Sequence, residues 1–213
     1  MSSKLLSPTK SRDAERSRTS ILDAAEELFA HKGFDGVSFA EIGVKAGVSR
    51  GTPGYFFGSK EELYQAVLDR VFGTALRDIS RAAERAATAH NPREVIAAGV
   101  EGYLDFIAAN PNFVRLVERE SLGDGKKLAQ NPVHVRALQV GTNSTAQFLP
   151  PEMVDWVDLR QLMISIMGLC WFPLAHASTL LPALGLDPHD PEFLHQRKRH
   201  VVDLLCRAFL KEE

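Results

Sequence analysis

The sequence predicts an all-α fold, and three observations carry that prediction. No segment of the 213-residue chain shows sustained alternation of apolar and polar residues with period two. Apolar residues recur instead at helical spacing, and signals for helix starts and stops are dense. We therefore expect about nine helices: an amino-terminal three-helix domain containing a helix-turn-helix, followed by a larger helical domain.

The first sixty residues contain clear signals for three helices and the start of a fourth. The first helix is predicted from an apolar face and a glycine stop at Gly33; that face consists of Ile21, Leu22, Ala25, Leu28 and Phe29. Ser38 and Ser59 each open a capping box, with a glutamate three residues later. The first box starts a short helix that ends at Gly47, and the second starts a long one. Between them, Ser49 can cap a third, short helix.

The remaining helices are marked by a repeated pair of residues. Four times an asparagine or aspartate, which is a good N-cap, precedes a proline suited to the first helical position. These prolines are Pro92, Pro111, Pro132 and Pro191. The last two long helices are expected over Pro151–Leu181, kinked by Pro173, and over Pro191–Leu210. Gly123–Gln130 is predicted to be a polar loop.

These signals divide the chain into a flexible basic arm (1–14), an amino-terminal domain (15–75, with the helix-turn-helix at about 38–57) and a carboxy-terminal domain (76–213). Residues 1–20 hold five basic and two acidic side chains. A basic arm is typical of nucleic-acid binding, but a solvated tail would have the same composition.

Several classes of protein are disfavoured. The start of the chain lacks a secretory signal, and no apolar run is long enough to span a membrane, so we expect a cytoplasmic protein with no membrane partner. Cys170 and Cys206 form no CxxC pair, and the sequence contains no HExxH, GxSxG or phosphate-binding glycine loop. We therefore predict no enzymatic activity, no metal site and no cofactor.

The stretch GVSRGTPGYFFGSKEEL, Gly47–Leu63, completes a motif with helix-turn-helix proportions. In such motifs the second helix enters the DNA major groove. Gly51 and Thr52 are small enough for close approach, and Arg50 can read guanine or grip phosphate. Ser49 and Lys60 can bind phosphate oxygens. The alternative, a helical adaptor without sequence-specific DNA binding, would leave these exposed groups unexplained.

The run ILDAAEELFAHKGFDGVSFAEIGVKAGVSRGTPGYFFGSKEELYQAV resembles the amino-terminal domain of the tetracycline repressor (TetR) family of bacterial transcriptional regulators. The resemblance implies a repressor that binds double-stranded DNA at an inverted-repeat operator as a homodimer. It also implies release by a small-molecule effector, which the sequence does not identify. With Gly51 added, the matching positions give the candidate DNA-binding residues: Ser38, Ser49, Arg50, Gly51, Thr52, Tyr55, Phe56 and Lys60.

The chain departs from the family at Pro53-Gly54, where a leucine followed by a tyrosine is usual. We expect Phe57 to pack inward against the first helix and Leu63, and Tyr55 to contact phosphate. Phe56 could be a packing wedge or could contact a sugar or a thymine methyl group.

In the carboxy-terminal domain the resemblance implies that the last two helices form a four-helix dimer interface. It also implies an effector pocket among the middle helices, although a plain hydrophobic core would show the same residue types. The candidate pocket residues are Tyr103, Phe106, Phe113, Leu116, Met163, Met167, Trp171 and His176.

Overall fold

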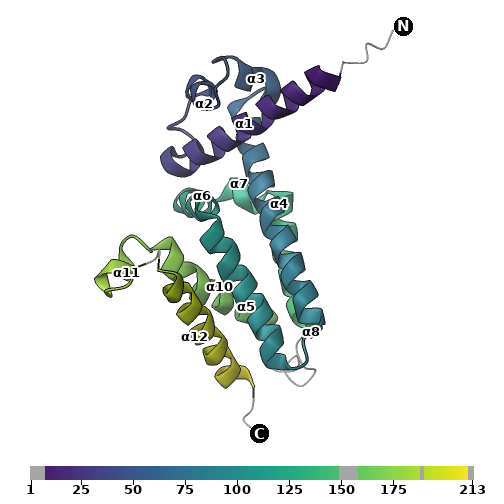
Figure 1. The fold of residues 1–213 in the computed structure, drawn as a ribbon, viewed down its shortest axis with the longest axis vertical. Helices are drawn as coiled ribbons and strands as arrows, with labels where there is room; N and C mark the ends of the chain where they lie inside the picture. Colours follow the sequence, from purple (N-terminus) through teal and green to yellow (C-terminus); the bar gives the residue numbers. More distant parts are fainter. Residues whose placement is uncertain (1–7, 149–157, 188–189, 211–213) are drawn as a thin grey trace. The chain divides into compact units, whose positions relative to one another are not determined.

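The computed structural model describes residues 8–148, 158–187 and 190–210, and these residues form 11 helices and no strand (Figure 1). The predicted all-α fold is therefore confirmed. Two short helices, each four residues long, were not predicted separately from the sequence. One is α7 (Lys126–Ala129), which lies in the expected polar loop, and the other is α11 (Leu180–Ala183). The expected helix start at Pro151 lies outside the described residues.

The chain folds into two compact units. Unit 1 consists of Met1–Val71 and Arg115–Asn131, and unit 2 of Phe72–Val114 and Pro132–Glu213. Two helices contribute residues to both units, namely α4 (Lys60–Ala87) and α6 (Pro111–Leu122). This division differs from the expected boundary after residue 75 because Arg115–Asn131 packs with the amino-terminal helices.

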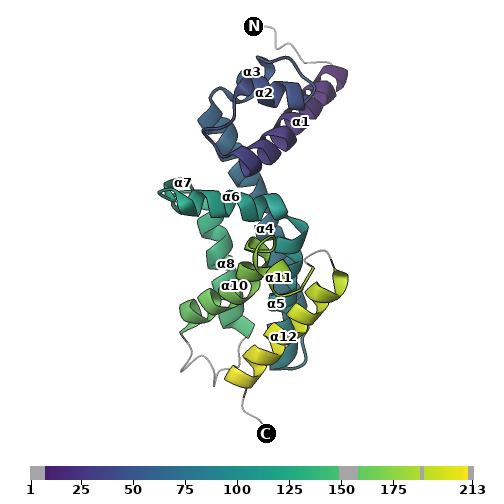
Figure 2. The same cartoon turned by 90° about the vertical axis from the view of Figure 1, so that its left-hand side faces the viewer.

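Unit 1 is built on α1 (Pro8–Lys32), against which α2 (Phe39–Lys45) and α3 (Thr52–Phe57) pack (Figures 1 and 2). Its most deeply buried side chains include Ile21, Phe29, Ile42, Leu63 and Val67. Helix α1 begins at Pro8, so residues 8–14 are helical and do not form the flexible arm that we expected. Proline suits a first helical turn, and the residues that follow favour a helix.

The predicted capping box at Ser59 forms with both of its bonds, and at Ser38 the serine half of the box forms. The Ser38 hydroxyl accepts a hydrogen bond from the Glu41 amide at 3.2 Å. The Ser59 hydroxyl accepts one from the Glu62 amide at 3.1 Å, and the Ser59 amide donates to Glu62 Oε2 at 2.8 Å. These bonds satisfy amide groups that lack partners at the start of a helix, and they fix where α2 and α4 begin.

Unit 2 is arranged around α5 (Pro92–Ala109), which packs against α8 (Pro132–Phe148), α10 (Leu159–Ala175) and α12 (Pro191–Phe209) (Figures 1 and 2). Its core includes Val100, Leu104, Ile107, Cys170 and Val201. The helices expected at Pro92, Pro111, Pro132 and Pro191 begin at those prolines.

Two of the four expected N-caps are seen directly. Asn91 accepts a hydrogen bond from the Glu94 amide, and Asp190 accepts one from the Glu192 amide. Asn110 behaves differently, because its side-chain amide donates to the Phe106 carbonyl at 2.7 Å, at the end of α5.

Candidate nucleic-acid interface

The turn between α2 and α3 packs tightly against α2 at a glycine. Gly47 has a φ of +70°, which glycine adopts readily, and the Val48 amide returns to the Gly43 carbonyl at 2.9 Å. A Cβ atom at Gly43 would lie 2.8 Å from the Ser49 carbonyl oxygen and 3.1 Å from the Arg50 Cα. Gly43 is therefore required for the close approach of the turn. The sequence analysis missed this role, which a glycine in the middle of a short helix could have signalled.

Helix α3 begins at Thr52, with Gly51 as its N-cap. The expected cap by Ser49 is wrong: no side chain caps this helix, and the Ser49 hydroxyl lies 2.7 Å from the Thr52 hydroxyl. Ser49 precedes the helix by three residues because a turn, closed by a 3.0 Å bond from the Thr52 amide to the Ser49 carbonyl, comes first.

Pro53 and Gly54 fit a regular helix. Proline lies in the first turn, where its missing N–H has no helical acceptor to lose. Gly54 is helical and does not have a positive φ. A Cβ atom there would lie 3.4 Å from Phe39 Cε2, in van der Waals contact with the ring. The small residue at 54 therefore lets α3 lie close to Phe39 of α2.

Two buried side chains hold the inner face of α3, Pro53 and Phe57. Phe57 is 8% exposed, as expected for a ring that packs inward, and the Arg18 guanidinium of α1 lies 4.5 Å from its centroid. A six-residue helix has little stability of its own. Its position in unit 1 therefore depends on this tertiary packing.

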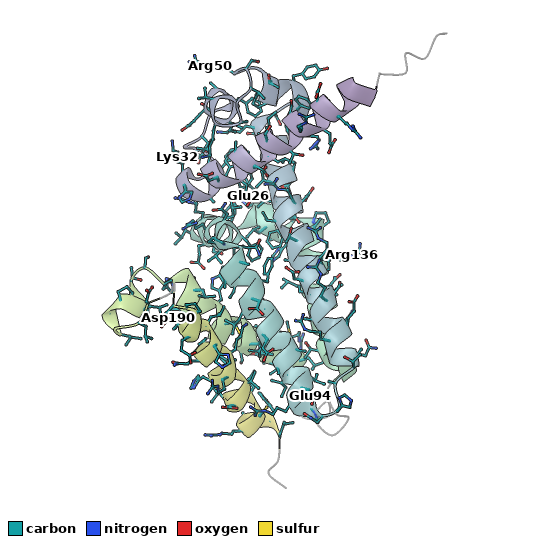
Figure 3. The ribbon with its side chains drawn as sticks, in the orientation of Figure 1. Glu26, Lys32, Arg50, Glu94, Arg136 and Asp190 are labelled. Atoms are coloured by element: carbon teal, nitrogen blue, oxygen red, sulfur yellow. The ribbon has the colours of Figure 1, made fainter. Side chains whose placement is uncertain are left out.

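The opposite side of α3 and the preceding turn are exposed. Ser49, Arg50 and Gly51 are exposed, and Arg50 extends outward from the turn (Figure 3). Tyr55 is 86% exposed and meets the ring of Phe56 edge to face at 5.5 Å. Of the other candidates, Ser38 is exposed, while Thr52 and Phe56 are half-buried.

Lys60 differs from the other candidate DNA-binding residues because its ammonium group holds a loop. Its Nζ donates to the carbonyl oxygens of Phe34 at 3.1 Å and Val37 at 3.2 Å, and it lies 4.4 Å from the centroid of the Phe34 ring. An ammonium has three donors, and two of them are used here. Lys60 thus ties the connection between α1 and α2 to the start of α4, a role that the sequence did not reveal.

The segment Arg115–Asn131 is bound to the end of α1 and to α4 within unit 1. Arg119 Nε donates to the Ala30 carbonyl at 2.8 Å, where the carboxy-terminal end of α1 favours a cation. The Tyr64 hydroxyl donates to Glu120 at 2.7 Å. Burial, and then the acceptor Glu120, raise the pKa of Tyr64 far above its usual value. Its hydroxyl therefore stays protonated and remains a donor.

The residues predicted for an effector pocket are only partly brought together. Phe106, Phe113 and Trp171 form an aromatic cluster in unit 2. The ring centroids of Phe106 and Phe113 lie 4.8 Å apart, and those of Phe113 and Trp171 lie 5.8 Å apart. Leu116 belongs to unit 1, and His176 is exposed at the end of α10, against Phe172. Tyr103, Met163 and Met167 are half-buried in unit 2.

None of the helices among the described residues combines the length and the apolar character of a membrane span. In the same part of the chain, no three histidine, cysteine, aspartate or glutamate side chains are grouped so that they could hold a metal ion.

Comparison with known proteins finds a matching family model in each half of the chain. Residues 21–67 match the family model of bacterial regulatory proteins of the tetR family, and residues 152–205 match that of the tetracyclin repressor-like C-terminal domain. The chain is 26% identical to the HTH-type transcriptional repressor NicS of Pseudomonas putida, over 93% of this chain and 95% of that protein.

Solved structures share the fold. A TetR-family regulator from Mesorhizobium loti aligns with a TM-score of 0.67 at 18% identity, over 92% of this chain and 97% of that one. The regulator FadR from Bacillus subtilis, in complex with stearoyl-CoA, aligns with a TM-score of 0.60 at 20% identity, over 88% and 96%. With its amino-terminal helix-turn-helix and its helical carboxy-terminal domain, the chain belongs to the tetracycline repressor (TetR) family of transcriptional regulators.

Proposed function

We propose that the protein is a homodimeric repressor that binds an inverted-repeat operator through α3 and is released by a small molecule bound in unit 2. The observation that carries the proposal is the division of α3 into two faces. Pro53 and Phe57 are buried, whereas Tyr55 and the preceding Arg50 extend into solvent. An exposed arginine in this turn and an exposed tyrosine on the fixed helix are suited to DNA, which offers phosphate groups and the polar edges of bases.

Each of these polar side chains has a specific role in this proposal. Arg50 donates to base edges in the major groove, and the hydroxyls of Ser38, Ser49, Thr52 and Tyr55 donate to phosphate oxygens.

Three further candidates act through shape or charge. Gly51 permits close approach, because a Cβ atom there would meet nothing within 4 Å in the free protein and its small size serves no internal packing. Phe56 lies beside Tyr55 and contacts a sugar or a thymine methyl group. Lys60 attracts phosphate through the donor that the loop leaves unused.

The proposed dimer interface uses apolar side chains of α10 and α12 that are exposed in the single chain. Ile164 is 62% exposed, Phe172 54% and Leu204 43%. Gly168 lies between Ile164 and Phe172 at four-residue spacing and is also exposed. Two copies packed through such a surface would be related by a two-fold axis, which an inverted-repeat operator matches.

Two comparisons support repression and effector release. NicS, which aligns with this chain over nearly its whole length, is a transcriptional repressor, and the FadR structure, similar in fold, holds stearoyl-CoA. Unit 2, with its aromatic cluster, is the part of this chain that we propose binds a small molecule.

Selection of bound duplexes from a random library tests the proposal. We expect enrichment of one inverted repeat, and a steep fall in affinity for it as salt rises, because phosphate contacts release counterions. Arg50→Ala is expected to weaken the enrichment and to relax it at the base position that this side chain reads. If no sequence is enriched and binding does not depend on salt, the protein is instead a helical adaptor.

A further inference from the structure

Two ammonium groups from different helices contact the ring of Phe34, in the connection between α1 and α2. Lys60 Nζ, at the start of α4, lies 4.4 Å from the ring centroid, and Lys127 Nζ, from α7, lies 3.7 Å from it. Lys127 Nζ also lies over the ring of Tyr64, 5.0 Å from its centroid. A cation within about 6 Å of the centroid is attracted to the face of an aromatic ring. Phe34 and Tyr64 therefore form a binding surface for the Lys127 side chain.

The two adjacent lysines of α7 have different surroundings. Lys126 is exposed and forms an ion pair with Asp124 at 2.9 Å. Lys127 is half-buried, and in the part of the chain that the structure describes it forms no ion pair and no hydrogen bond. Lys127 is thus held through its contacts with the two rings, whereas Lys126 is a solvated surface cation.

Helix α7, which carries Lys127, is itself fixed within unit 1. Leu128, the next residue, is buried, and the fully buried Asn131 donates from its side chain to Asp69 of α4 at 2.8 Å. The bonds described above also join the end of α6 to α1 and α4. A single helical turn has little stability of its own, so these contacts determine where α7 lies. They present the Lys127 ammonium group to Phe34 from a fixed position.

The position of Phe34 bears on where α2 begins. The carbonyl oxygens of Phe34 and Val37 both accept hydrogen bonds from Lys60. Val37 is buried, and Ser38 follows it as the N-cap of α2. Helix α2 packs in turn against α3, and its Gly43 lies against the turn that leads into α3. A displaced Phe34 would therefore shift both helices of the helix-turn-helix.

We propose that Lys127 is a positioning residue for operator binding, which holds Phe34 in place and so fixes α2 and α3 without contacting DNA itself. The inference rests on the proposed function, in which α3 reads an operator. It adds to the candidate DNA-binding residues a side chain outside the helix-turn-helix. The positive charge of Lys127 is the feature required, because the charge is what the ring faces attract.

Lys127→Met tests this requirement, because methionine keeps an unbranched apolar side chain and removes the charge. Operator affinity is expected to fall about threefold to thirtyfold, the factor that corresponds to the loss of a cation–π contact. The salt slope of binding is expected to stay unchanged, because no phosphate contact is lost. Lys127→Arg keeps the cation and is expected to bind as the wild type does. Lys126→Met is the matched control: it removes a charge from the adjacent, exposed position and is expected to leave affinity unchanged.

Amide hydrogen exchange tests the positioning without DNA. The amides of Ile42 and Ala46 donate to the backbone carbonyl oxygens of Ser38 and Ile42, and so report on α2. In Lys127→Met these two amides are expected to exchange several-fold faster than in the wild type, whereas the amides of α12 are expected to keep their wild-type rates. Should Lys127→Met not fold, Phe34→Leu decides: it must weaken operator binding and speed the same exchange.

Three results would each overturn the proposal. The first is that Lys127→Met binds the operator, or exchanges its α2 amides, as the wild type does. The second is that Lys126→Met loses as much affinity as Lys127→Met. The third is a salt slope that falls by about one in Lys127→Met, which would make Lys127 itself a phosphate contact. If the wild-type protein selects no operator, the proposed function fails, and hydrogen exchange alone still decides whether Lys127 positions α2.

Discussion

Replacing Phe57 with alanine tests how α3 is held. The ring is 8% exposed and closes a helix of six residues, with the Arg18 guanidinium 4.5 Å from its centroid. Removing a buried phenylalanine ring usually costs about 3–5 kcal/mol of unfolding free energy. Losing the contact with Arg18 adds about 0.5–1 kcal/mol. We therefore expect Phe57→Ala to lower the unfolding free energy by about 3.5–6 kcal/mol.

Tyr55→Ala is the matched control, because it removes an aromatic ring from the same helix that is 86% exposed. Urea unfolding followed by far-ultraviolet circular dichroism measures both variants. Tyr55→Ala is expected to change the unfolding free energy by no more than about 0.5 kcal/mol and to weaken DNA binding. A loss under about 1 kcal/mol in Phe57→Ala, together with weaker DNA binding, would show that the two aromatic roles are reversed.

Three further predictions concern charged side chains of unit 1. Arg50→Ala should relax base preference at one operator position by about 1–3 kcal/mol. Arg50→Lys should not restore the preference, because lysine lacks the paired donors of arginine. Competition with mutated operators measures the base preference of both variants. Lys60→Ala should lower the unfolding free energy by about 1–3 kcal/mol, since it removes two hydrogen bonds from a charged donor. It should also reduce the salt slope of DNA binding by about one. An unchanged melting temperature would contradict the predicted loss of stability. Hydrogen bonds from the Ser59 amide, and then from its hydroxyl, lower the pKa of Glu62 below 4.5. The stability that the Glu62 carboxylate contributes is therefore present above that pH and is lost as pH falls through the folded pKa. Glu62→Gln should be less stable at pH 7 and lose less stability at acid pH, and an unchanged pH profile of unfolding would argue against the capping box.

The helix starts were predictable because their signals are local. Pro92, Pro132 and Pro191 each follow a residue suited to an N-cap, and the helices begin there. Such pairs act within one turn of helix, so no knowledge of distant contacts is needed. Asn110 shows where such local prediction fails, because its side chain bonds to the end of the preceding helix and does not cap the next one. The sequence offers no means of distinguishing an asparagine that caps the next helix from one that bonds to the preceding helix.

The features of the candidate site that the sequence did not predict depend on residues far apart in the chain. Lys60 was predicted from its position at a helix start, but its partner carbonyls lie 26 and 23 residues earlier. Arg119 bonds to Ala30 across 89 residues, and this bond is one of those that join Arg115–Asn131 to the rest of unit 1.

The exposed face of α3 was predictable in part. The burial of Phe57 was expected from its position, and the exposure of Tyr55 agrees with its proposed contact with phosphate. The close packing of Gly43 and Gly54 was not foreseen, because a glycine in a short helix predicts flexibility as readily as close approach.

The most direct test of the proposed function is a titration of the protein against the selected inverted repeat and against one isolated half-site, with the mass of each complex measured by sedimentation. A two-fold dimer that reads DNA through α3 predicts two protomers or a multiple of two on the full repeat. It also predicts much weaker binding to the half-site and a steep dependence on salt. A single protomer that binds the half-site as tightly as the full repeat would contradict the account.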